Sequence, residues 1–273
     1  MPLLREIQLA VYDIMKQIVA VCERHQLRYY LAGGTLLGAV RHNGFIPWDD
    51  DLDLEMPWKD YKKFIKYARK ELPKDLFVQT FYTDPGYPNI FMMVRKNGTS
   101  AMPVAAKELG IHWGIEVDIF PLIGVYKNSR LKRFQQRKMR HISKMLLIEY
   151  NKLAEPESMK DDPIFAEYAR YPLRKRIRIS RFLLFLLTQS RRPDELVPVN
   201  YGMKNYYRKD YYEKTVKLKY EDGEYDAPGA YREVLTTLYG DYMTPPPEDK
   251  RGGHELSMGT IIWDLQRDYS EYQ

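Results

Sequence analysis

The chain has 273 residues, 44% of them hydrophobic, and a formal net charge of +6. It can bury a sizeable core, and we expect one catalytic domain with a helical insertion. Cys22 is the single cysteine, which excludes an internal disulfide and a cysteine-rich zinc site and fits a cytoplasmic protein. No secretion signal follows Met1, and the longest apolar run, 182–187, is far shorter than the roughly 20 residues that cross a bilayer.

The first elements are predicted in the order helix, strand, glycine turn, helix, strand. Apolar residues recur at helical spacing between Ile7 and Cys22, which predicts an amphipathic helix over 3–26. A short strand over 28–32 then leads into Gly33 and Gly34. The elements expected after these glycines are a helix over 35–41, a turn at Asn43-Gly44, a strand over 51–55 and a helix over 58–71.

Further strands and helices are predicted along the remainder of the chain. In the candidate strand 114–120, Ile115, Val117 and Ile119 alternate with Glu116, Asp118 and Phe120, so the two sets lie on opposite faces. The other expected elements are strands over 77–81 and 90–96, basic helices over 128–153 and 163–190, a helix over 231–239 and a proline break at 245–247. This order predicts an α/β (α+β) fold, with a mixed sheet flanked by helices.

The basic residues are concentrated in one segment. Residues 127–192 hold 18 lysines and arginines against 6 aspartates and glutamates, whereas the rest of the chain holds 25 against 31. We therefore divide the chain into a catalytic core over 1–126, a basic helical insertion over 127–192 and a tyrosine-rich part over 193–273 that completes the catalytic domain. The insertion is either a solvated helical face or a surface that contacts something anionic.

The run GGTLLGAVRHNGFIPWDDDLDLEM, from Gly33 to Met56, indicates metal-assisted chemistry on a phosphate. Glycines let backbone N–H groups approach an anion closely, and a helix that begins at Thr35 points its positive end at the same place. Asp51 and Asp53 lie two residues apart on a strand, so their carboxylates emerge on one face. A divalent cation bound by oxygen ligands is the usual way to hold two such charges together.

Two other interpretations of the aspartates compete with catalysis. The WDDD segment could be an Asx turn that opens a strand. A calcium loop would use Asp49, Asp51 and Asp53, but Leu54 stands where that loop needs glycine and Asp60 where it needs glutamate. The glycine turn upstream favours catalysis over the Asx turn. Asp118, on a separate strand, supplies a third carboxylate, and Asp49 could add a fourth on the same side.

The sequence resembles the LicD family, which is related to the fukutin group and to the nucleotidyltransferase-fold superfamily. The resemblance covers most of the chain and rests on GGTLLGAVRHNGFIPWDDDLDLEMPWKDYKKF, RKNGTS, GIEVDIFPL and YGDYMTPPPEDKR. It implies a nucleotidyltransferase-like core and transfer of phosphocholine from CDP-choline to a hydroxyl of a bacterial surface-glycan precursor, of teichoic acid or lipopolysaccharide type, with release of CMP. Relatives use other CDP-activated alditols, and a non-catalytic nucleotide- or glycan-binding module is a further alternative.

The resemblance also implies roles for individual residues. Asp51 and Asp53 become ligands of Mg²⁺, or of Mn²⁺, and Asp118 a third ligand or the general base that takes the acceptor's proton; Asp49 is a possible additional ligand. The remaining candidates bind substrate: Gly33, Gly34 and Thr35 hold the donor diphosphate, and Arg41, Arg95 and Lys96 neutralise phosphate oxygens or else pair with surface carboxylates.

Aromatic side chains are the expected means of holding a choline headgroup, which cannot donate a hydrogen bond. Trp48, Trp58 and Trp113 stand beside the acidic motifs, although aromatic residues fill cores more often than they form cages. His42 and His112 are interpreted as structural. The tail segment Tyr239, Gly240, Asp241 and Tyr242, with Lys250, Arg251 and His254, matches the family's tail motif, and its role is open.

The apolar run over 182–187 has two interpretations. Flanked by Arg181 and Arg191, it could place the insertion on an anionic membrane beside a lipid-linked acceptor, at the inner face of the cell membrane. A helix-packing face in the core is slightly favoured over this. Nucleic acid is not an expected partner, because no recognised RNA-binding signature accompanies the basic helices.

Overall fold

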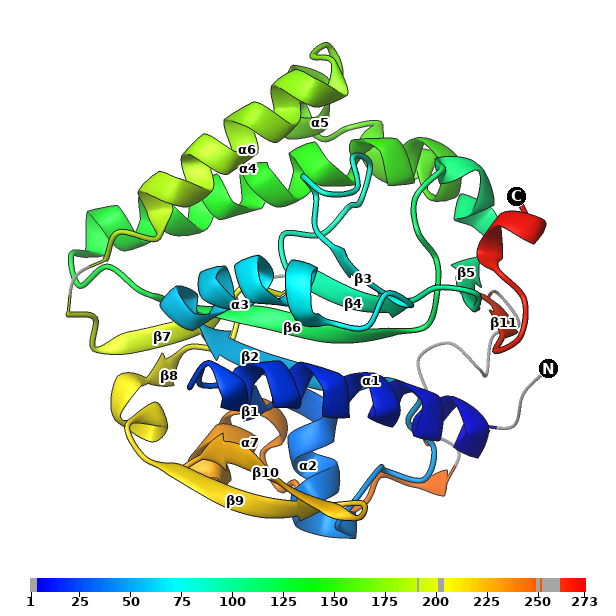
Figure 1. Cartoon of the computed structure of the whole chain (residues 1–273). Coiled ribbons are helices and arrows are strands. Elements are labelled where there is room, and N and C mark those ends of the chain that lie inside the picture. The colour runs from blue at the N-terminus through cyan, green and yellow to red at the C-terminus, as the bar shows by residue number, and fades with distance from the viewer. Residues whose placement is uncertain (1–3, 191, 201–203, 249–250, 252–260) are drawn as a thin grey trace.

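The computed structural model describes residues 4–190, 192–200, 204–248, 251 and 261–273. Its centre is a mixed sheet with strands in the order β1-β2-β6-β4-β3, extended by β7, which pairs with β6, and by β8, which pairs with β7 (Figure 1). The strands of this sheet are β1 (Tyr30–Leu31), β2 (Asp53–Pro57), β3 (Leu76–Gln79), β4 (Met92–Lys96), β6 (Glu116–Gly124), β7 (Glu195–Pro198) and β8 (Tyr207–Arg208). Among its pairs, β2 and β6 run parallel.

Two small antiparallel pairs and a set of helices surround this sheet. The pairs are β9 (Thr215–Tyr220) with β10 (Gly223–Pro228), and β5 (Ser100–Pro103) with β11 (Ile261–Asp264). The α-helices are α1 (Leu4–Arg24), α2 (Gly33–His42), α3 (Trp58–Glu71), α4 (Ser129–Ala154), α5 (Pro163–Ala169), α6 (Leu173–Leu187) and α7 (Tyr231–Tyr239). Short 3₁₀ turns lie at Val104–Leu109, Pro156–Met159, Lys209–Tyr212 and Tyr269–Glu271.

The two faces of the sheet bury different residues. Val117 and Ile119 of β6 are fully buried in a cluster that also holds the apolar faces of α1 and α3, which lie across the sheet in Figure 1. Phe120, from the same strand, belongs to a second cluster with α4 and α6. The alternation predicted for this strand is therefore confirmed, and it leaves Asp118 on the face that does not meet α1 and α3.

Most predicted elements are present with shifted ends. The α/β class, the helices near 3–26, 58–71 and 231–239 and the strands near 77–81, 90–96 and 114–120 are confirmed. The strand predicted over 51–55 begins at Asp53, and the helix predicted over 35–41 begins at Gly33. The strands β5 and β7–β11 were not predicted, because short strands with few alternating apolar residues leave a weak pattern.

The second basic helix is broken, contrary to the prediction of one helix over 163–190. The helix α5 ends at Ala169, and α6 starts after Pro172, which adopts an extended ψ of 150°. Proline cannot donate the backbone hydrogen bond that a continuous helix needs, so the chain turns there. Part of the run over 182–187 also departs from the favoured packing interpretation: Leu184 and Leu187 are buried, whereas Phe182 and Phe185 are exposed.

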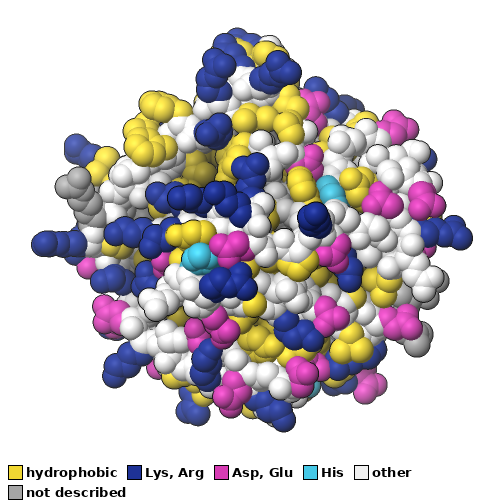
Figure 2. Space-filling model, viewed as in Figure 1, with side chains coloured by type: hydrophobic (Ala, Val, Ile, Leu, Met, Phe, Trp, Pro, Cys, Tyr) yellow, Lys and Arg dark blue, Asp and Glu magenta, His cyan; other side chains and the backbone are white. Residues whose placement is uncertain are grey.

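The basic segment 127–192 packs closely on the sheet domain. Figure 1 shows α4 and α6 side by side along one edge of the molecule, and Figure 2 shows Lys and Arg side chains gathered where α5 and α6 project. Arg176 of α6 is buried; it donates to the Met145 carbonyl at 3.1 Å and pairs with Glu149.

The boundaries at 126 and 192 remain predictions. Of the helices described, none is long and apolar enough to span a bilayer.

Candidate active site

The register of β2 against β6 brings two of the predicted catalytic carboxylates together. Asp53 is the partner of Asp118 in this parallel pair, and Met93 of β4 pairs with Asp118 from the other side. Paired residues on neighbouring strands project from the same face, so both carboxylates stand on the face opposite α1 and α3. Asp51 lies two residues before β2 and is exposed. The two aspartates therefore do not share a strand face as predicted: Asp53 begins the strand, and Asp51 lies in the loop before it.

The acidic side chains perturb one another. Burial, followed by the charges of Asp51, Asp118 and Asp49, raises the pKa of Asp53 well above its usual value. Burial and the charges of Asp51 and Asp50 raise the pKa of Asp49 to about 8. A cluster of like charges in a region that excludes water favours protonation or a bound cation.

The first turn of α2 closes on these carboxylates, and this contact explains Gly33 and Gly34. A Cβ at Gly33 would lie 2.5 Å from an oxygen of Asp53, and Gly33 also has a positive φ of +50°. A Cβ at Gly34 would lie 2.6 Å from an oxygen of Asp49. The glycines therefore let the positive end of a helix approach a cluster of negative charge. Their predicted contact with a diphosphate stays a prediction.

Thr35 makes a structural contact with the strand that carries Asp53. Its side chain is buried, does not line the cavity described below, and its Oγ1 accepts a 2.8 Å hydrogen bond from the backbone N–H of Asp53. This bond ties the start of β2 to the first turn of α2. The threonine thus fixes the position of Asp53, and its contact with a donor diphosphate stays a prediction.

A cavity of about 950 Å³ opens over the carboxylates. Its walls come from the sheet, from α4 through Leu147 and Tyr150, and from the tail segment through Tyr239, Asp241 and Tyr242. The predicted site residues that line it are Gly33, Gly34, Arg41, Asp49, Asp51, Asp53, Arg95 and Asp118. Segments from all three predicted parts of the chain therefore meet at one cavity.

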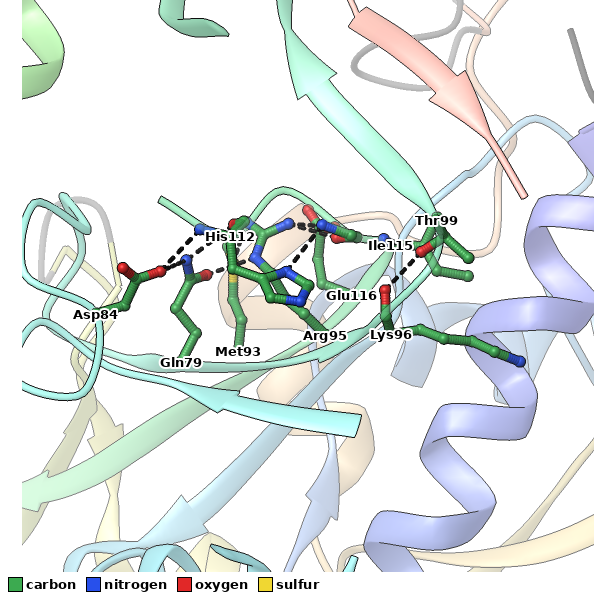
Figure 3. A network of polar contacts seen from close by, with 10 residues as sticks. Gln79, Asp84, Met93, Arg95, Lys96, Thr99, His112, Ile115 and Glu116 are labelled. Carbon is green, nitrogen blue, oxygen red and sulfur yellow. Dashed lines mark hydrogen bonds and ion pairs between the residues drawn. The ribbon is translucent and has the colours of Figure 1, made fainter. Parts of the chain in front are cut away.

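Lys96 does not join this group. Arg95 pairs with Glu116 and Met93 with Asp118, so these residues of β4 share the face of the carboxylates. Lys96 follows Arg95 on the strand and points to the opposite face, away from the network in Figure 3. Lys96 is not among the residues that line the cavity, and its predicted contact with phosphate oxygens stays a prediction.

Arg95 is buried in a network of polar contacts (Figure 3). Its Nη1 donates to the Gly114 carbonyl at 2.6 Å and to Glu116 at 2.8 Å. Its Nε donates to Gln79, and its Nη2 reaches the sulfur of Met93 at 3.0 Å. With these contacts made, the guanidinium has little capacity left for a phosphate. Its position favours a role in holding Glu116 at the cavity wall.

Two glutamates that line the cavity were not among the predicted site residues. Burial raises the pKa of Glu116 to about 7, against the lowering effect of Arg95. Burial also raises the pKa of Glu55 to about 7, although Tyr212 donates to its carboxylate at 2.8 Å and lowers it. Both are visible in the sequence as the second neighbours of Asp53 and Asp118, because strand alternation puts residues two apart on one face.

His112 is a structural residue, as expected. Its Nδ1 accepts from the Gly114 N–H at 3.0 Å, and its Nε2 lies 2.8 Å from Asn97. Burial and the charge of Arg95 lower the pKa of His112 to about 4, so the ring is neutral at pH 7. His42 lies beside Trp48, and burial and Arg41 lower its pKa too.

Two arginines flank Trp48, which lines the cavity. Arg41 lies 5.9 Å and Arg251 5.1 Å from the centre of this ring. Arg41 also donates to the Tyr242 carbonyl at 3.1 Å. Burial and the charge of Arg251 lower the pKa of Arg41. The tail motif therefore supplies a second cation beside Trp48; Lys250 and His254 of this motif lie outside the described residues.

Aromatic rings form much of the remaining wall. Of the three tryptophans singled out in the sequence, Trp48 and Trp113 line the cavity, whereas Trp58 stacks on Tyr61 at 5.6 Å. The other aromatic residues of the wall are Tyr87, Phe120, Tyr150, Tyr207, Tyr239, Tyr242 and Trp263. Several of these come from segments that carry no motif, and the sequence therefore gave no signal for them.

Carboxylate oxygens are suitable ligands for a divalent cation, but these side chains are not arranged as a complete metal site. Within the described part of the chain, no three His, Cys, Asp or Glu side chains are placed to hold a metal ion. Mg²⁺ commonly takes one or two carboxylates together with substrate phosphates, so a preformed site of three ligands is not required. The mutual repulsion around Asp53 is what a cation would relieve. Binding of Mg²⁺ or Mn²⁺ by Asp51, Asp53 and Asp118 remains a prediction.

Comparisons with known proteins identify related sequences. Residues 26–137 match the family described as LicD/FKTN/FKRP, nucleotidyltransferase domain. The chain is 29% identical over 282 residues, 95% of this chain and 98% of the relative, to the lipopolysaccharide cholinephosphotransferase LicD of Haemophilus influenzae. It is 45% identical over 51 residues, 19% of this chain and 10% of the relative, to the human ribitol 5-phosphate transferase FKRP.

Replacing Arg95 tests whether its role is structural. In Arg95→Met, Glu116 and Gln79 lose their buried partner, and we expect the free energy of unfolding to fall by about 3–5 kcal/mol. Arg28→Met is the control, because Arg28 is 59% exposed where it pairs with Asp60, and such a pair contributes about 1 kcal/mol or less. Urea denaturation measures both. An Arg95→Met protein as stable as the control variant would return Arg95 to the phosphate-binding candidates.

Proposed function

We propose that the chain moves phosphocholine from CDP-choline to a surface glycan. This proposal starts from two findings. Residues 26–137 are a nucleotidyltransferase domain of the LicD/FKTN/FKRP family, and the chain is a transferase. The acceptor is a hydroxyl of a glycan precursor of lipopolysaccharide or teichoic acid type, and CMP is released. Mg²⁺ is the proposed cofactor.

The observation that carries this proposal is the pairing of Asp53 with Asp118 beneath the first turn of α2. This arrangement places negative groups suited to a cation next to a helix N-terminus suited to phosphate oxygens, within one cavity. Similarity along 95% of the chain to a cholinephosphotransferase supports the transferred group.

The reaction requires attack by an acceptor oxygen on the β-phosphorus of the donor. The new bond joins that oxygen to phosphocholine, the bond from the β-phosphorus to the bridging oxygen breaks, and CMP leaves with the electron pair. A bound Mg²⁺ would neutralise charge on the phosphate oxygens. A carboxylate on the shared face of β2 and β6 takes the acceptor's proton, and Asp118 is the first candidate.

The aromatic part of the cavity lining supports a choline headgroup. A quaternary ammonium ion is held by aromatic faces, and Trp113, Tyr207 and Trp263 are among the rings that line this cavity. An alditol would need several hydrogen-bonding side chains instead. Transfer of a CDP-linked phosphoalditol is the second candidate, since a segment of 51 residues also matches a ribitol 5-phosphate transferase.

A donor panel tests the proposal directly. We expect CMP release from CDP-choline with Mg²⁺ present, at least about tenfold faster than from CDP-ribitol or CDP-glycerol, and no release after chelation. Chromatography of the nucleotide products measures the rates with a glycan acceptor present. Release from CDP-ribitol alone would select the alditol candidate, and release that ignores chelation would exclude the proposed cofactor.

Replacing the paired carboxylates separates catalysis from folding. We expect Asp53→Asn and Asp118→Asn each to lower turnover by about 100-fold or more, because each removes a charge needed for metal binding or proton transfer. Neither variant should lose stability, because each relieves repulsion between buried like charges. Asp161→Asn, at an exposed position, is the control and should match the parent. Full turnover in both site variants would refute the assignment.

Gly33 offers a test of the contact between α2 and Asp53. Gly33→Ala puts a methyl group against the Asp53 carboxylate, and a displacement of this kind is expected to lower turnover by about 100-fold. Gly110→Ala is a matched control, since Gly110 has a similar φ of +66° but no atom within 4 Å of the added Cβ. Both variants bear the same backbone cost of about 1 kcal/mol. Equal turnover in the two would show that the contact is dispensable.

A further inference from the structure

The outer face of α6 combines arginines with exposed apolar side chains. At helical spacing, side chains separated by three, four, seven, eight and eleven residues share a face. We call this face the α6 surface, and it consists of Arg174, Arg178, Arg181, Phe182, Phe185 and Leu186. The opposite face holds the buried residues Arg176, Ser180, Leu184 and Leu187, which pack toward α4.

The exposure of this apolar group is unusual for a packed helix. Phe182 is 61% exposed, Phe185 62% and Leu186 42%. These side chains follow one another along the end of α6, and contiguous exposed apolar area of this kind marks a binding surface. Figure 2 shows hydrophobic side chains beside Lys and Arg side chains in the upper part of the molecule, where α6 lies.

The arginines of the α6 surface differ from those basic residues of this segment that form ion pairs. On α4, Lys132 pairs with Glu195 and Lys144 with Asp162. Among the residues that the structure describes, no ion pair involves Arg174, Arg178 or Arg181; these three instead line a shallow groove with Ile177 and Phe182. Arg181 also lies 5.5 Å from the ring centre of Tyr82, which is itself 37% exposed.

We propose that the α6 surface docks on an anionic lipid bilayer. Phe182, Phe185 and Leu186 enter the boundary between headgroups and acyl chains, and the arginines contact lipid phosphates. Charge complementarity favours lipid over a second copy of the chain, because a symmetric contact would oppose each arginine to a like charge. A nucleic acid would stack on aromatic rings but would gain little from Leu186.

The docking surface is connected to the active-site cavity through α4. The helix α4 packs against α6, and its Leu147 and Tyr150 line the cavity. Gln135, near the start of α4, donates to the Leu187 carbonyl at 2.7 Å and fixes the end of α6. The docking surface and the cavity wall are therefore joined by one rigid helix pair. Membrane binding itself requires neither the donor nor turnover, so its test is independent of the proposed function.

Vesicle co-sedimentation of the full chain tests the docking surface. The vesicles are phosphatidylglycerol mixed in equal parts with phosphatidylcholine, compared with phosphatidylcholine alone. Two double variants probe the apolar and charged parts, Phe182→Ser with Phe185→Ser and Arg178→Glu with Arg181→Glu. Their controls replace exposed side chains elsewhere, Leu9→Ser with Val104→Ser and Lys214→Glu with Lys219→Glu. Circular dichroism melting confirms that each variant is folded.

We expect the parent to sediment with the anionic vesicles, weakly at high salt and not with phosphatidylcholine alone. Each double variant of the α6 surface should bind at least about tenfold more weakly, and each control within about twofold of the parent. Parent protein that stays in the supernatant at low salt would overturn the proposal. Equal loss of binding in the controls, or concentration-dependent dimers that the Phe182→Ser and Phe185→Ser changes dissociate, would do the same.

Discussion

The structure of this protein depends on how it holds several carboxylates together where the parallel strands β2 and β6 begin to pair. Asp53 and Asp118 are paired by the parallel register of β2 and β6, and Asp49 closes in from the preceding loop against Gly34. Burial and the repulsion between these charges raise the pKa values of Asp49 and Asp53. Burial of like charges lowers stability. Natural proteins therefore keep such clusters mainly where the charges serve a function.

The surrounding elements supply what this cluster needs. The first turn of α2 presents its positive end to the carboxylates, and the hydroxyl of Thr35 ties the backbone of Asp53 to that turn. On the other side, Arg95 anchors Glu116 through a buried network that reaches Gln79. Cations lie outside the carboxylate cluster as well, because Arg41 and Arg251 are both close to the Trp48 ring. The cavity wall therefore holds Arg41 in addition to the acidic side chains.

The basic segment serves two surfaces at once. Its helix α4 buries Met139 and Ile142 in the cluster on the sheet and supplies Leu147 and Tyr150 to the cavity. Its helix α6 uses one side to pack on α4 and leaves Phe182 and Phe185 on the other. Because α6 has two different faces, the net charge of the segment alone could not distinguish a solvated face from a binding face. That distinction depends on which arginines already form ion pairs.

The sequence by itself identified most of the acidic residues that meet at the candidate site. Motif residues from Gly33 to Asp53, with Asp118, predict phosphate chemistry, and alternation along 114–120 predicts which side of that strand carries Asp118. The pattern also determined the α/β class and the amphipathic helices, because strand and helix periods depend on neighbouring residues only. The same alternation could have predicted that Glu55 and Glu116 share a face with Asp53 and Asp118.

Only the tertiary structure decided which of these residues work together. Lys96 follows Arg95 in the sequence, yet strand direction separates them, and the partners of Arg95 come from β3 and β6. Thr35 proved to bond to Asp53, and the aromatic wall gathers residues as distant as Trp113 and Trp263. Such contacts depend on register, on burial and on long-range packing, which a local pattern does not contain. The exposure of Phe182 was decided in the same way, by the face that α6 turns toward α4.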